Sequence, residues 1–259
     1  MSEHWKKYKS LAEMIRAQAE KSPNRLALVA RSAAGQEQRL SYAQMVWQGE
    51  KFAQGLKQIG ASERDHIGIA LDNKSAYEAI VTLLACAFGG MVCVPINARF
   101  AEEEFLHALT LADIRFVVCD GITGPRIEAV RGKAPMLEKI LLAGGAPGDS
   151  IILWNDVYGR AQRTEAIWPQ RHHEDISEIL FTSGTTSRPK AAQMSHRSAL
   201  ASAYGFADAM SLRQGDVYQS FFPFFTTACL RCVLYPSWFV GATAVVDPEL
   251  NVADILGRM

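Results

Sequence analysis

The sequence has 259 residues, and 49% of them are hydrophobic, which is enough for a sizeable core. Lysine plus arginine and aspartate plus glutamate both number 27, so the charge balance argues against a nucleic-acid or anionic-membrane surface as the main partner. Residues 1–7 lack the apolar segment of a secretory signal, and we expect a cytoplasmic protein. The odd number of cysteines, five, then favours reduced and mostly buried thiols over a disulfide framework.

Short apolar runs alternate with helical patterns along the chain. The clearest helix is predicted between Ser41 and Ile59, where Ser41 and Gln44 form a capping box and Gly60 ends the helix. Another begins near Ala101, followed by three glutamates at its positive end. Strands alternating with helices predict an α/β fold with mostly parallel sheets flanked by helices. The predicted strands are residues 26–30, 67–71, 92–96, 116–119, 140–142 and 179–182.

Residues 79–96 contain no charged side chain, which raises the question of a membrane span. Gly89, Gly90 and Pro95 interrupt the stretch, and Val92 to Val94 favour a strand. We therefore expect a buried helix, a turn and a strand.

Two segments are suited to be linkers: the glycine-rich residues 144–148 and the polar residues 160–174. We expect residues 1–170 to form a first α/β subdomain. Residues 171–259 are expected to hold a phosphate-binding segment and the start of a second α/β subdomain.

Residues 179–190 join an apolar run to a loop rich in hydroxyl side chains. Hydroxyls donate hydrogen bonds to phosphate oxygens, glycine lets the backbone approach a ligand, and basic side chains add positive charge. The sequence therefore predicts a phosphate-binding loop. Its residues are Thr182, Ser183, Gly184, Thr185, Thr186, Ser187 and Lys190, with Arg188 beside them.

The Walker-A loop of kinases and ATPases is the main alternative for such a segment. Counted from Gly184, Pro189 stands where the second glycine of that motif should be, and Ala191 stands at the position of its hydroxyl residue. Proline has no N–H to offer a phosphate. The Walker-A interpretation therefore fails at two of its fixed positions.

The loop resembles the phosphate loop of the adenylate-forming superfamily, whose pattern is Tyr/Phe-Thr-Ser-Gly-Ser/Thr-Thr-Gly-x-Pro-Lys-Gly with a histidine or asparagine shortly after. Two positions depart from it, because Ser187 and Ala191 stand where glycine is usual. The variant at 187–190 is similar to the loop of carnitine and crotonobetaine CoA ligases. The matching residues are Phe181, Thr182, Ser183, Gly184, Thr185, Thr186, Pro189, Lys190 and His196.

The resemblance extends over about residues 10–250. It includes residues 40–44, 66–71 and 83–97, which look like the amino-terminal half of acyl-CoA synthetases. Residues 222–226 are similar to the family motif Pro-x-Phe-His that borders the acyl pocket, and residues 241–243 resemble the segment that follows it.

The resemblance implies an AMP-forming acid–thiol ligase, with ATP, Mg²⁺ and CoA as reactants or cofactors and a small carboxylic acid as substrate. It assigns the loop residues to nucleotide binding, Lys190 to catalysis, and Phe224, Phe225 and Thr226 to the acyl group. Thr226 occupies a position that is commonly histidine. No residue of this chain is assigned as a metal ligand, because the Tyr-Gly-x-Thr/Ser-Glu motif that supplies the magnesium-binding glutamate does not occur in the sequence.

Members of the family are about twice as long, and their small carboxy-terminal domain and Thr-Gly-Asp motif have no counterpart here. We expect the chain to represent the amino-terminal part of such a ligase, inactive alone and prone to self-association through apolar surface. A degenerate homologue that binds a nucleotide or an acyl ligand without turnover is the alternative. An unrelated α/β nucleotide-binding protein is a third interpretation.

Overall fold

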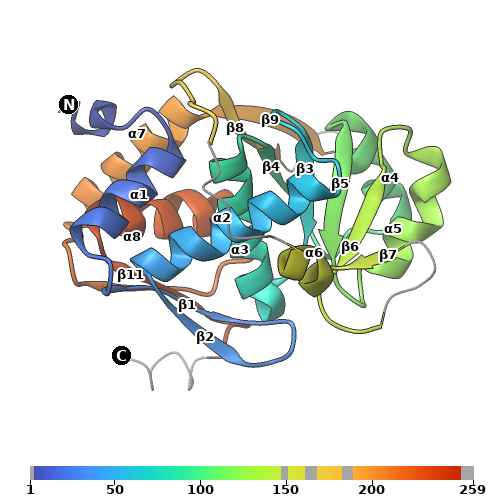
Figure 1. The fold of residues 1–259 in the computed structure, drawn as a ribbon, viewed down its shortest axis with the longest axis horizontal. Helices are drawn as coiled ribbons and strands as arrows, with labels where there is room; N and C mark the ends of the chain where they lie inside the picture. The colour runs from blue at the N-terminus through green and yellow to red at the C-terminus, as the bar shows by residue number, and fades with distance from the viewer. Residues whose placement is uncertain (1–2, 147–150, 161–167, 183–188, 252–259) are drawn as a thin grey trace.

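The computed structural model describes residues 3–146, 151–160, 168–182 and 189–251, which form two β-sheets covered by helices (Figure 1). The α-helices are α1 (Leu11–Lys21), α2 (Tyr42–Gln58), α3 (Ala76–Gly89), α4 (Glu102–Leu111), α5 (Gly124–Val130), α6 (Trp154–Arg160), α7 (His196–Ala209) and α8 (Tyr235–Val240). Short 3₁₀ helices are η1 (His4–Lys7), η2 (Asn73–Ser75) and η3 (Arg131–Lys133), and η4 (Ala228–Leu234) is a π-helix.

The larger sheet has seven strands in the order β7-β6-β5-β3-β4-β8-β9. All neighbours are parallel except the last pair, β8 and β9, which is antiparallel. Its strands are β3 (His66–Ala70), β4 (Val92–Pro95), β5 (Ile114–Cys119), β6 (Lys139–Leu142), β7 (Ile151–Leu153), β8 (Ile176–Thr182) and β9 (Lys190–Ser195).

Helices cover both faces of this sheet, which is why its central strands are apolar at successive positions. On one face, Ile67 and Phe116 belong to a core shared with α2 and α3. On the other, Val94 and Val117 belong to a core shared with α4 and α5, which lie at the end of the molecule far from the smaller sheet (Figure 1). The α/β fold with mostly parallel sheets flanked by helices is thus confirmed.

The smaller sheet joins the beginning of the chain to its later part. Its four strands lie in the order β10-β11-β1-β2, and β1 pairs in parallel with β11 in the register Val29 to Val245. Its strands are β1 (Leu26–Arg31), β2 (Glu37–Ser41), β10 (Val217–Ser220) and β11 (Thr243–Val246). Strands from both sides of residue 170 therefore occur in each sheet, and the predicted subdomain boundary stays a prediction.

The predicted helix after Ser41 is confirmed as α2. The Ser41 hydroxyl accepts a hydrogen bond from Gln44 N, and the Gln44 side chain accepts one from Ser41 N, so the capping box is complete. α4 begins after Ala101 as expected, and the Glu104 carboxylate accepts the Ala101 N–H.

The uncharged stretch 79–96 forms the predicted helix, turn and strand: α3 and β4 are joined at Gly90. Gly90 has φ +74°, and a side chain there would collide with Arg171 and Pro169. Among the described residues, no helix has the length and apolar character needed to cross a bilayer. The five cysteines are free thiols; four are buried, and Cys232 is half-buried.

A buried carboxylate at the start of α3 generates a pH-dependent stability. Glu78 accepts the Ala33 N–H at 2.9 Å and so fixes the turn between β1 and β2, and burial raises its pKa to about 7. The folded state then binds more protons than the unfolded state between about pH 4.5 and 7. Stability should therefore fall as pH rises through this window and stay level above it.

We predict that Glu78→Gln flattens this dependence, because the amide can still accept the Ala33 N–H and carries no charge. At pH 8 the variant should be more stable than the parent by about 1 to 3 kcal/mol. Urea unfolding at pH 5 and pH 8 measures this, with Glu103→Gln at an exposed position of α4 as the control. Identical pH profiles for parent and Glu78→Gln would contradict the prediction.

Candidate functional site

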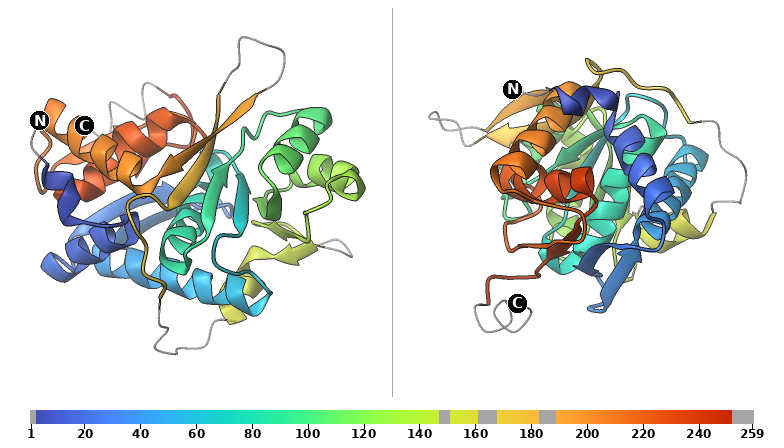
Figure 2. Two further views of the ribbon diagram at one scale, coloured as in Figure 1. Left: turned by 90° about the horizontal axis from the view of Figure 1, so that it is seen from above. Right: turned by 90° about the vertical axis from the view of Figure 1, so that its left-hand side faces the viewer.

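The antiparallel hairpin of β8 and β9, which we call the phosphate hairpin, carries both ends of the predicted phosphate loop. Thr182 is the last residue of β8, Lys190 is the first residue of β9, and the two are direct cross-strand partners. Both are exposed, at the end of a hairpin that extends beyond the rest of the sheet (Figure 2). The backbone register therefore places Thr182 and Lys190 directly opposite each other, with their side chains on the same face of the hairpin. Predicted site residues Ser183, Gly184, Thr185, Thr186 and Ser187 lie outside the described residues.

The hairpin is anchored on the sheet by contacts that the sequence does not reveal. Ile179 and Leu180 of β8 are buried, and the Phe181 ring meets the Phe100 ring at 6.5 Å between centroids. His107 of α4 donates from Nε2 to the Pro189 carbonyl at 2.9 Å, directly before Lys190. A lone histidine on an amphipathic helix gives no sequence signal for this role.

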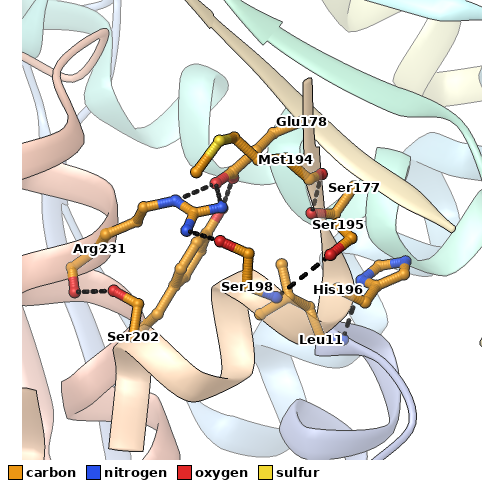
Figure 3. A network of polar contacts seen from close by, with 10 residues as sticks. Leu11, Ser177, Glu178, Met194, Ser195, His196, Ser198, Ser202 and Arg231 are labelled. Atoms are coloured by element: carbon orange, nitrogen blue, oxygen red, sulfur yellow. Dashed lines mark hydrogen bonds and ion pairs between the residues drawn. The ribbon is translucent and has the colours of Figure 1, made fainter. Parts of the chain in front are cut away.

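His196, at the histidine position of the family pattern, is buried at the start of α7. Its Nδ1 accepts the Leu11 N–H at 3.3 Å, which ties α1 to the segment after β9 (Figure 3). Burial, followed by the nearby Arg171 charge, lowers the pKa of His196 to about 4. The imidazole is therefore neutral at physiological pH and has a structural role here.

The predicted acyl segment, residues 222–226, lies between β10 and η4. Phe224 is fully buried in the core, and Phe225 is half-buried and lines a cavity. The Thr226 hydroxyl donates to Pro223 O at 2.7 Å and accepts from Cys229 N at 3.3 Å. Thr226 therefore closes the turn that leads into the π-helix.

Asn73 holds this segment in place. Its Nδ2 donates to Phe222 O at 3.0 Å and to Asp247 O at 2.9 Å, while its Oδ1 accepts the Phe224 N–H at 2.8 Å. One buried amide thus joins the start of η2, the acyl segment and the residue that follows β11. Sequence reasoning missed this residue, since its partners are about 150 or more positions away along the chain.

A cavity of about 650 Å³ lies beside the acyl segment. It sits beyond the carboxyl ends of parallel strands β3, β4 and β5, the edge at which open α/β sheets bind ligands. Its lining combines aromatic rings with charged groups of both signs, so it can receive a ligand with an apolar and a charged part. The lining includes Asp72, Lys74, Arg99, Asp120, Arg126, Phe221, Phe222 and Phe225.

The described residues contain no group of three or more histidine, cysteine, aspartate or glutamate side chains placed to hold a metal ion. Cys229 and Cys232 have the spacing of a redox or zinc motif, but Cys229 is buried and burial raises its thiol pKa to about 12. A thiol with such a pKa is a poor metal ligand and a poor nucleophile.

Comparison with known proteins gives consistent matches. The profile of the AMP-binding enzyme family matches residues 15–258. A crotonobetaine/carnitine–CoA ligase of Salmonella paratyphi A is 29% identical to the chain, over 96% of this chain and 48% of the ligase. The corresponding protein of Salmonella arizonae is also 29% identical, over 91% and 46%. The chain thus spans about half the length of the curated relatives it matches.

Solved structures share the fold. A putative long-chain-fatty-acid CoA ligase from Rhodopseudomonas palustris superposes with a TM-score of 0.85 at 24% identity, covering 96% of this chain and 60% of that one. The anthranilate CoA ligase AuaEII, in complex with anthranoyl-AMP, superposes with a TM-score of 0.83 at 24% identity, covering 96% and 47%.

We predict that Asn73→Ala destabilises the protein by about 2 to 4 kcal/mol, because it leaves the buried backbone groups of Phe224 and Asp247 and the partly buried carbonyl of Phe222 without this partner. Asn97→Ala is the control, because Asn97 is only half-buried and makes one bond to Arg99 N. That change should cost below about 1 kcal/mol. Urea unfolding of the parent and the two variants measures both effects. Equal losses of stability in the two variants would contradict this role of Asn73.

Proposed function

Because the chain belongs to the AMP-binding enzyme family, we propose that it is the amino-terminal part of an ATP-dependent ligase that joins a small carboxylic acid to CoA. A carboxylate oxygen attacks the α-phosphorus of ATP, pyrophosphate leaves, and an acyl-adenylate results. The CoA thiol then attacks the acyl carbon and AMP leaves. CoA ligases among the relatives support this reaction class.

The register of Thr182 opposite Lys190 is the observation that carries the proposal. Pyrophosphate leaves with a high negative charge, and donors aimed at its oxygens stabilise that charge in the transition state. We assign this role to Thr182, Ser183, Thr185, Thr186 and Lys190, with Gly184 and Ser187 completing the nucleotide loop. An exposed ammonium on a flexible stem can follow the leaving group better than a rigid guanidinium can.

We assign recognition of the acid to Phe224, Phe225 and Thr226. The cavity beside Phe225 and the fixed backbone of the segment support this assignment. The Thr226 hydroxyl is engaged in the turn and Phe224 is buried in the core, so the backbone of the segment and the Phe225 ring, which lines the cavity, are the groups offered to the acid. The acids named for the relatives differ widely, so we specify the acid only by its class, a small carboxylic acid.

Mg²⁺ is expected with ATP, but the metal ligands that the family pattern assigns are not among the motifs of residues 1–259. We therefore propose that the 259-residue chain alone forms no acyl-CoA above background. A longer product that contains the chain should release pyrophosphate in the presence of ATP and an acid. Pyrophosphate and CoA-consumption assays with a panel of carboxylic acids test both statements.

CoA consumption by the 259-residue chain would contradict its inactivity alone. A longer product that binds ATP but shows no turnover across the panel would favour the alternative, a non-catalytic nucleotide- or acyl-binding homologue.

We predict that Lys190→Ala slows pyrophosphate release by about one to three orders of magnitude in the form of the protein that is active, since one electrostatic contact of the transition state is lost. The affinity for the acid should change little. Single-turnover pyrophosphate release measures the rate, and Lys133→Ala, at an exposed position of η3, is the control. An unchanged rate would remove Lys190 from the mechanism.

A further inference from the structure

A buried polar cluster links β8 to the π-helix that follows the acyl segment (Figure 3). We call Glu178, Ser198, Arg231 and Tyr235 the Glu178 cluster. Arg231 donates from Nε to Glu178 Oε1 at 2.6 Å, its Nη2 lies 2.6 Å from the same oxygen, and its Nη1 donates to Ser198 Oγ at 2.8 Å. The Tyr235 hydroxyl donates to the other carboxylate oxygen. Glu178 is 0% exposed and Arg231 is 3% exposed.

The cluster connects the two parts of the proposed site. Glu178 lies on β8, the strand that leads into the phosphate hairpin, four residues before Thr182. Arg231 lies five residues after Thr226, within η4. A contact between these side chains therefore fixes the distance and orientation of the π-helix relative to the strand that carries the hairpin.

The π-helix itself suggests that the arrangement serves function. Such helices are rare and are frequently found at functional sites. Here η4 spans seven residues directly after the turn closed by Thr226. Side chains outside the helix, Glu178 and Ser198, hold Arg231, and the Arg231 carbonyl accepts from the Ser202 hydroxyl at 3.4 Å. The cluster thus holds η4 in one orientation relative to β8 and α7.

Stability alone is a weak reason for such a cluster. The cost of removing a carboxylate and a guanidinium from water roughly cancels their attraction, and apolar pairs of similar volume are often as stable. Loss of one partner is different, because the remaining charge stays buried and unpaired. The pair is therefore better explained by the geometry that it imposes than by the free energy that it contributes.

We propose that Glu178 and Arg231 are positioning residues for the acid, acting through the π-helix to hold the acyl segment at a fixed place relative to the phosphate hairpin. The proposal rests on the proposed function for its kinetic consequence. Attack on the α-phosphorus requires the carboxylate oxygen within about 3 to 3.5 Å of phosphorus, and a misplacement of about 1 Å can lower the rate about 100-fold.

The test replaces the ion pair by two apolar side chains of similar length, Glu178→Met with Arg231→Met. Arg231→Met alone should lower the melting temperature by about 10 °C, and the double variant should recover part of that loss, because the buried Tyr235 hydroxyl loses its carboxylate acceptor. In the active form of the protein, the double variant should still show a kcat/KM for the acid at least tenfold lower, while the KM for ATP changes less than threefold. Full activity at recovered stability would overturn the proposal.

Amide hydrogen exchange on the 259-residue chain gives a readout that does not need turnover. In the double variant, residues 222–234 should exchange at least threefold faster, while β3 and β5 keep their protection. Unchanged exchange in residues 222–234 would overturn the coupling even where activity is not observed. Absence of acid-dependent pyrophosphate release from every parent form would instead refute the proposed function.

Tyr235→Phe keeps the test decisive if the double variant does not fold, because it removes only the hydroxyl that donates to Glu178. It should lower kcat/KM for the acid by about threefold or more and speed exchange in residues 222–234. Tyr158→Phe, which removes a hydroxyl on α6 that bonds to Gln48, is the matched control. Equal behaviour of the two variants would overturn the proposal.

Discussion

The pairing of β8 with its neighbours is the interaction on which the rest of the candidate site depends. β8 pairs in parallel with β4 at the Cys93 and Glu178 positions and antiparallel with β9 over its whole length. The parallel side ties it to the buried sheet, and the antiparallel side returns the chain so that Lys190 lies opposite Thr182. The same strand carries Glu178 in its buried part and Thr182 at its exposed end, so core packing and the proposed nucleotide contact belong to one strand.

Contacts between distant segments place the second part of the site. β1 pairs with β11, the Tyr42 hydroxyl donates to Ala242 O at 2.7 Å, and Asn73 bonds to the backbone of the acyl segment at Phe222 and Phe224. These bonds fix a loop that has little regular structure of its own. Because each buried backbone group of such a loop needs a partner, a few polar side chains determine where the loop lies.

Local patterns in the sequence predicted the local structure. The helix after Ser41 and the apolar strands of the sheet follow from capping chemistry and from burial on both faces. β2 and β9 were not predicted as strands, because their residues are mostly polar or small and the strands lie at the edges of their sheets. β10 and β11 were also not predicted; they are four residues long and acquire their sheet only by pairing with each other and with β1.

The residues of the candidate site also differ in how far the sequence predicts them. The phosphate-binding loop could be predicted because its residue types follow one another along the chain. Asn73, His107 and Arg231 were not predicted, because the partners of their side chains lie from 33 to 174 residues away and each residue type is unremarkable in its own segment. The side chains that hold a segment in place through distant contacts are therefore harder to predict from the sequence than a local motif proposed to bind a ligand.

A crystal structure of the chain with a carboxylic acid and a non-hydrolysable ATP analogue, such as α,β-methylene ATP, tests the proposed site most directly. The β- and γ-phosphates should lie at the end of the β8–β9 hairpin beside Thr182 and Lys190, with the acid against residues 222–226. An analogue bound with its β- and γ-phosphates away from the hairpin would contradict the proposed site.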